Sequence, residues 1–126
     1  MVDKLTPNQM RRIDEIQQFM RTVEHVKKLV AELEGNRAAR AVIINNICGG
    51  IARELSQMRQ RALSANVGTL ADVAGGLAVI ASRQGSGLNF KIRALAEGVN
   101  SLTIQLEQSL KAATQPEKTA AEKKPS

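Results

Sequence analysis

The sequence has very few aromatic residues: among its 126 residues are two phenylalanines, Phe19 and Phe90, and no tryptophan or tyrosine. Base-stacking platforms and aromatic cages need several aromatic rings, so both kinds of binding site are nearly excluded. The single cysteine, Cys48, cannot form an internal disulfide, and with the single histidine, His25, it is too few for a tetrahedral zinc site within one chain. A secreted disulfide-rich protein is therefore not expected, and no cofactor is implied.

Proline, which breaks helices, is absent from most of the chain. The three prolines stand at positions 7, 116 and 125. Hydrophobic residues make up 43% of the sequence and recur every three or four positions, the spacing of one helix face. The sequence therefore predicts an all-α protein: an antiparallel bundle of about four helices, three long and one short and buried, in one domain over residues 1–113. Residues 114–126 have no large apolar side chain, which predicts a disordered tail.

No stretch of the chain is apolar for long enough to suggest a membrane span or an export signal. The longest apolar run, residues 73–81, covers nine positions when glycine is counted, whereas a spanning helix needs roughly 18. The first nine residues contain no apolar core of the kind found in signal peptides. We therefore expect a cytoplasmic protein with a reduced thiol and no membrane partner.

The first helix has clear signals at both ends. Residues 6–9, Thr-Pro-Asn-Gln, supply the hydroxyl, proline and amide of a capping box, which predicts a helix start at this point. Gly35 and Asn36 supply a C-terminal stop. The second helix is expected to start near Asn36 or Arg37.

The second helix is expected to carry a heptad seam and to be most buried in its first half. The seam residues alternate spacings of three and four: Ala41, Ile44, Cys48, Ile51, Leu55, Met58 and Ala62. Val42, Ile43 and Ile47 widen this stripe, which places residues 41–52 among several neighbouring helices. Cys48 on the seam is expected to be buried and unreactive.

The third helix has almost no polar face. Thr69 and Asp72 repeat the capping pattern and predict its start, and the other residues up to position 81 are apolar or glycine, which predicts a short, enclosed, central helix. Residues 85–87, Gly-Ser-Gly, supply a turn, and Ser86 or Asn89 is the candidate cap of the next helix. A fourth helix is expected from about 88 to 113, with a second seam made of Leu88, Ile92, Leu95, Val99, Leu102, Leu106 and Leu110.

Two glycine pairs interrupt the expected second and third helices. Gly49–Gly50 and Gly75–Gly76 lie in similar seven-residue segments, and an interior glycine costs about 1 kcal/mol relative to alanine. We expect small patches that let these two helices, or two copies of the chain, approach closely; a local kink is the alternative. The packing and interaction residues predicted from the seams and patches are Ile44, Gly49, Gly50, Ile51, Gly75, Gly76, Leu95, Val99 and Leu102.

The net charge is +6, and a local excess of arginine accounts for much of it. Between positions 37 and 61 one acidic residue, Glu54, stands against five arginines: Arg37, Arg40, Arg53, Arg59 and Arg61. Such a cluster attracts phosphates or an acidic partner, and weak, salt-sensitive binding of nucleic acid is one expectation. A solvated face is the alternative.

Two sets of residues resemble helical enzymes. His25 with Lys28 resembles the phosphate-accepting motif of histidine phosphotransfer domains, although Leu29 replaces the glycine that follows the lysine in that family. A larger set resembles the residues with which all-helical chorismate mutases hold a dicarboxylate, except that Ala39 stands where a lysine is expected. This set comprises Arg11, Ile13–Asp14, Lys28, Arg53–Glu54 and Gln105.

The leading hypothesis from the sequence is a non-enzymatic protein-interaction module, an adaptor or assembly component that self-associates. The two seams, the glycine patches and the nonpolar third helix supply more apolar surface than one small bundle hides, and symmetric dimers are the commonest remedy. Binding of nucleic acid or an acidic partner through the arginines is the second hypothesis. The two helical enzymes are the third.

Overall fold

The computed structural model describes residues 5–83 and 87–115 and contains four α-helices. They are α1 (Pro7–Gly35), α2 (Ala41–Ser64), α3 (Gly68–Ser82) and α4 (Leu88–Ala113), and no strand occurs in these two ranges. The predicted all-α class and the number of helices are confirmed. Most of the predicted tail, and Ser86 as a candidate cap, lie outside the described residues.

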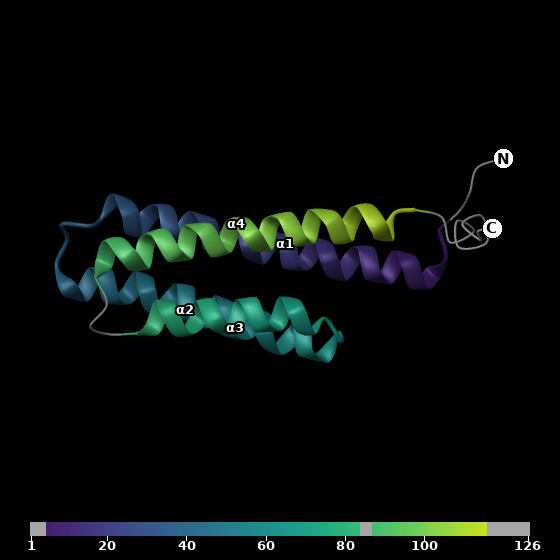
Figure 1. Cartoon of the computed structure of the whole chain (residues 1–126), viewed down its shortest axis with the longest axis horizontal. Helices are drawn as coiled ribbons and strands as arrows, with labels where there is room; N and C mark the ends of the chain where they lie inside the picture. Colours follow the sequence, from purple (N-terminus) through teal and green to yellow (C-terminus); the bar gives the residue numbers. More distant parts are fainter. Residues whose placement is uncertain (1–4, 84–86, 116–126) are drawn as a thin grey trace.

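The helices form an antiparallel ring in which each one contacts two neighbours. Helix α1 packs against α2 and α4, and α3 packs against α2 and α4, so consecutive helices are adjacent and the ring closes between α1 and α4. In Figure 1, α1 and α4 lie side by side above the α2–α3 hairpin and extend beyond the turn that joins α2 to α3. The chain therefore consists of a long helix pair and a shorter one around a common core.

The core is built from the predicted seams. The largest side chains that are fully buried come from α1, α2 and α4: Leu33, Ile51, Leu55, Met58, Leu95 and Leu102. The seam of α2 is confirmed from Cys48 onward, and the seam of α4 is buried at five of its seven positions. Cys48 itself is buried and free, as expected. Burial of these apolar surfaces is the main force that holds the helices together.

The start of α1 is the best-defined helix end in the molecule. The Thr6 amide donates to Gln9 Oε1 (2.9 Å) and the Gln9 amide donates to Thr6 Oγ1 (3.1 Å), so the predicted capping box is present. The Gln9 side chain also donates to the Gln115 carbonyl, which joins the beginning of α1 to the end of α4. Helix α1 ends at Gly35 with Asn36 as its cap, as predicted.

The predicted starts of the second and third helices are wrong. Helix α2 begins at Ala41, after a turn over residues 36–40. Helix α3 begins at Gly68 and no side chain caps it, so Thr69 lies inside the helix. The cause is the tight turn between α2 and α3. Asn66 has a left-handed backbone (φ 62°) and the Val67 amide donates to the carbonyl of Ala62 (2.8 Å), so the chain has already reversed when it reaches Gly68.

The first turns of α2 are also less buried than expected. Val42 and Ile43 are 59% and 43% exposed, so the prediction that residues 41–52 lie among several neighbours is wrong at its beginning. The reason is the length of α3. Helix α2 has 24 residues and α3 has 15, and the two helices run back from one turn, so roughly the first nine residues of α2 extend past the end of α3.

Helix α3 is short, as predicted, but it is not enclosed. Its inner face is buried through Leu70, Ala74 and Leu77, whereas Gly76 is exposed and Val79 is 53% exposed on the outer face. In a ring of four helices every helix keeps an outer face, and on α3 that face is made of small and apolar residues instead of polar ones. The absence of polar residues in the sequence therefore indicated an unusual surface and not a buried helix.

Candidate interaction face on helices α2 and α3

An open groove of about 840 Å³ follows the outer seam between α2 and α3. We call it the α2/α3 groove. Its lining residues come from positions three or four apart on each helix, which places them on one face of each. They are Gly49, Ala52, Arg53, Ser56 and Arg59 from α2, and Asp72, Gly75, Gly76, Ala78, Val79 and Ser82 from α3.

Within each glycine pair, the two Cα atoms face different surroundings. A Cβ atom added at Gly49 or Gly76 would meet nothing within 4 Å, so both positions open onto the groove. A Cβ at Gly50 would lie 3.9 Å from Leu29 Cδ1 on α1, an ordinary van der Waals distance. Each of the two helices therefore has one glycine beside which no other part of the described chain occupies the space.

Gly75 is the position where a glycine pair serves the packing of α2 on α3. A Cβ there would lie 2.8 Å from Arg59 Cδ and 3.1 Å from Arg59 Nε, so the stem of Arg59 crosses the bare backbone of α3. At this glycine the space between the two helices is filled by the Arg59 side chain and not by a close approach of the two backbones. Both helices continue through their glycine pairs without ending.

The closest glycine contact among the described residues lies elsewhere and was missed in the sequence. Gly98 on α4 faces Leu77 on α3, and a Cβ at Gly98 would lie 2.8 Å from Leu77 Cδ1 and 2.9 Å from its Cγ. Gly98 sits beside Val99 in the leucine seam of α4, and an isolated glycine next to a regular seam was the signal that could have found it.

The remaining residues predicted for interaction belong to the core. Ile51, Leu95 and Leu102 are fully buried, Val99 is 2% exposed, and Ile44 is half-buried. A partner does not reach these side chains while the bundle is folded. The structure therefore separates the predicted set into core residues and the groove glycines Gly49, Gly75 and Gly76.

The five arginines do not form one surface. Arg59 lines the α2/α3 groove, and Arg53 lines both this groove and a hollow between α1 and α2. The Arg61 guanidinium instead lies 6.0 Å from the centre of the Phe19 ring on α1 and donates to Thr22 Oγ1 at 2.9 Å. Arg61 thus belongs to the α1–α2 contact, where a hollow of about 230 Å³ includes it.

The other two arginines lie near the opposite end of α2. Arg40 is the N-cap residue of α2, and Arg37 in the preceding turn pairs with Glu34 at 3.5 Å. At 1.5 Å per residue, Arg40 and Arg59 are about 28 Å apart along the helix axis. The groove therefore offers two of the five arginines to a ligand.

The residues that resemble helical enzymes are also spread over the surface. His25 lies in a hollow of about 300 Å³ between α1 and α2, together with Glu32, Asn46 and Glu54. Lys28 is not among the residues lining that hollow. Within the described ranges, no group of three or more histidine, cysteine, aspartate or glutamate side chains is placed to hold a metal ion.

The chorismate mutase-like set is likewise divided. Arg11 and Lys28 lie on the same helix about 25 Å apart. Arg53 lines both the groove and the hollow that holds His25, and neither Arg11 nor Lys28 is among the residues that line these two. Gln105 is half-buried on α4.

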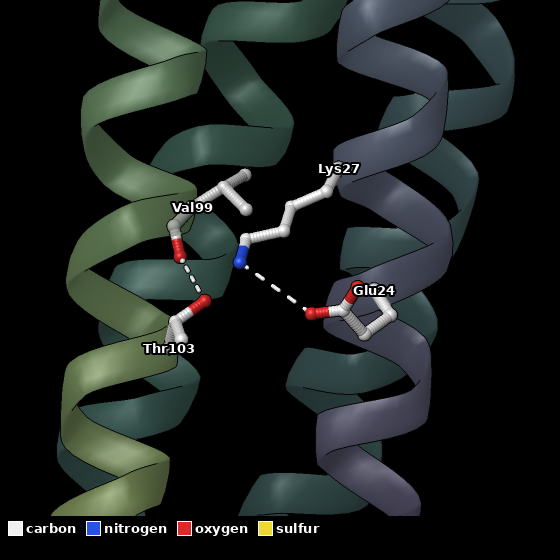
Figure 2. A network of polar contacts seen from close by, with 4 residues as sticks. All are labelled: Glu24, Lys27, Val99 and Thr103. Carbon is white, nitrogen blue, oxygen red and sulfur yellow. Dashed lines mark hydrogen bonds and ion pairs between the residues drawn. The ribbon is translucent and has the colours of Figure 1, made fainter.

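The outer seam between α1 and α4 is built differently from the groove. Figure 2 shows Lys27 of α1 reaching toward α4, where its ammonium group lies between the two helices and 3.4 Å from the Glu24 carboxylate. On the α4 side, the Thr103 hydroxyl donates to the Val99 carbonyl at 3.0 Å. Longer polar side chains thus lie along this seam.

Comparison with models of protein families, with curated proteins and with solved structures found no match to this chain. None of the four helices in the described part of the chain has both the length and the apolar character needed to cross a membrane.

Proposed function

We propose that this protein is a non-enzymatic helical interaction module, an assembly component that self-associates through the α2/α3 groove. The observation that carries the proposal is the open space at Gly49 and Gly76. Glycine inside a helix costs about 1 kcal/mol relative to alanine. The described contacts give these two glycines no use within one copy, so a helix that docks from outside is the use we assign to them.

The groove suits a helix for two reasons. Its small side chains leave the backbones of α2 and α3 accessible, so another helix can approach more closely than over longer side chains. Val79, 53% exposed, adds an apolar contact in the middle of the α3 wall. Adaptor activity toward a different protein, and a cytoplasmic location, belong to the same proposal.

The proposal is tested by filling the groove. We expect Gly49→Leu and Gly76→Leu to keep the fold, because both positions face open space and leucine favours helix. Both changes should convert the associated wild-type protein to monomer, as measured by sedimentation velocity. Circular dichroism and the thermal midpoint report whether the bundle is intact.

Ala31→Leu on α1 and Ala96→Leu on α4 are matched controls, since both alanines are exposed and lie outside the groove. They should leave the mass unchanged. A wild-type protein that remains monomeric at all concentrations, or leucine variants that retain the wild-type mass, would contradict the proposal. Salt-sensitive binding of nucleic acid, lost on replacing Arg53 and Arg59, would assign the groove to an anionic ligand instead.

A further inference from the structure

The two walls of the groove carry opposite charges. Arg53 and Arg59 stand on the α2 wall and Asp72 stands on the α3 wall, all three exposed. Among the described residues none of them takes part in an ion pair; the ion pairs found there are Lys27–Glu24 and Arg37–Glu34. A partner that matches this surface therefore presents an acidic group to α2 and a basic group to α3.

Two features align the two walls along the helix axis. The Arg59 stem reaches the Gly75 backbone, and one turn joins Ser64 to Gly68, so residues equally far from position 66 lie at about the same level. Asp72 lies three residues before Gly75, or about 4.5 Å along the axis of α3. Arg53 lies six residues before Arg59, in the direction away from Asp72. Arg59 is therefore the arginine nearer to the level of Asp72.

Suppose that two copies meet face to face with their helices aligned. The two-fold axis then lies in the contact plane and is either perpendicular or parallel to the helices, and the charges distinguish these two arrangements. An axis perpendicular to the helices stacks α2 on α2, which brings the two arginine-bearing walls together. An axis parallel to the helices stacks α2 of each copy on α3 of the other and preserves every axial level. The Arg59 of each copy then lies over the stretch of α3 in the other copy that carries Asp72 and Gly75, which are about 4.5 Å apart along the axis.

We infer that the groove receives a second copy of this chain about a two-fold axis parallel to α2 and α3, with Arg59 of each copy paired with Asp72 of the other. The inference rests on the self-association proposed above and adds the partner's orientation. Gly76, bare and next to Gly75, gives the second copy's α2 the room that this arrangement needs. Each protomer supplies both halves of the charge pair, so the surface is complementary to itself.

Charge reversal tests the pairing. Arg59→Glu and Asp72→Arg should each raise the dimer dissociation constant by about tenfold or more, because each change places like charges together twice per dimer. The double variant Arg59→Glu/Asp72→Arg should recover to within about threefold of wild type, which is the signature of direct coupling. Sedimentation equilibrium supplies the constants, and circular dichroism verifies the fold.

Two control variants sharpen this result. Arg61→Glu changes an arginine that lies outside the groove and should leave the dissociation constant unchanged. Arg53→Glu combined with Asp72→Arg should remain weak, because Arg53 is farther from the level of Asp72. The inferred pairing is overturned if Arg53→Glu restores the dissociation constant of the Asp72→Arg protein, or if Arg59→Glu does not restore it.

Cross-linking tests the axis independently of charge. Ser56 and Val79 line opposite walls and lie within about one helical turn of each other along the axis. Mixing a Ser56→Cys protein with a Val79→Cys protein should yield an oxidised heterodimer, whereas neither protein alone should cross-link. Cross-linking of Ser56→Cys with itself would place α2 on α2 and overturn the inferred axis.

The outcomes separate this inference from the proposed function. A wild-type protein that does not self-associate overturns both. Self-association that Gly76→Leu abolishes, but that shows no coupling between Arg59 and Asp72, overturns the orientation and leaves the interaction module standing.

Discussion

Helices α1 and α4 have long polar side chains along their shared outer seam, whereas α2 and α3 line theirs mainly with glycine, alanine and serine. The long pair is also joined at its end, where Gln9 of α1 binds the Gln115 carbonyl after α4. Helix α1 is the one helix of the described residues that begins with a side-chain cap; α2, α3 and α4 begin without one. The long pair therefore carries polar side chains along its outer seam, and the short pair leaves an open groove along its own.

The two pairs nevertheless share one core, and breaking it should give the largest effect. Leu55 of α2 and Leu102 of α4 are both fully buried. Leu55→Ala and Leu102→Ala should each lower the free energy of unfolding by about 2–5 kcal/mol through lost burial and a residual cavity. Urea unfolding followed by circular dichroism measures the change.

Leu63→Ala is the control for this prediction, since Leu63 is 48% exposed on the same helix as Leu55. It should cost about 0.5 kcal/mol or less. A Leu55→Ala variant no less stable than Leu63→Ala would mean that α2 does not share the core.

The contact between the two pairs at Gly98 should give the next largest effect. Gly98→Ala places a methyl group against Leu77 of α3, and this overpacking should lower the free energy of unfolding by about 1–3 kcal/mol. The higher helix propensity of alanine offsets part of this loss. In a Leu77→Ala background the same change should cost less, because the obstructing side chain is gone. A stability that rises on Gly98→Ala alone would show that α3 shifts away without cost.

Cap removal compares the helix starts of the two pairs. Thr6→Ala removes the hydroxyl that accepts from the Gln9 amide and should lower stability by about 1 kcal/mol. Thr69→Ala should have almost no effect, because the Thr69 side chain caps nothing in the structure. Equal losses from the two variants would contradict the assigned start of α3. Thermal unfolding of both variants under one condition decides this.

The same comparison shows what the sequence could predict. The capping box at Thr6 and the leucine seam of α4 are local patterns, and both were found correctly. The exposure of Val42 depends on where α3 ends, and the role of Gly98 depends on which residue of α3 lies opposite it. Neither fact is encoded within one helix, so periodicity alone did not reveal them.

Three of the nine predicted interaction residues, Gly49, Gly75 and Gly76, line the groove, and their orientation was not predicted. The glycine pairs were singled out for close approach, yet the sequence could not tell that Gly49 and Gly76 face outward while Gly50 and Gly75 face other helices. That division depends on how α2 and α3 are rotated about their axes when they pack. The arginines illustrate the same limit, because Arg59 and Arg61 are two residues apart and face different neighbours.

The smallest expected effect has the opposite sign and bears most directly on the comparison. Gly49→Ala and Gly76→Ala should each raise the stability of the monomer by up to about 1 kcal/mol, because alanine favours helix and the added methyl meets nothing within 4 Å. The measurement is urea unfolding at protein concentrations low enough for the monomer to dominate, since association would add its own stabilisation. A loss of stability from either variant would show that the monomer itself needs the glycine. A gain, together with weaker self-association, would show that the α2–α3 pair gives up its own stability to keep the groove open.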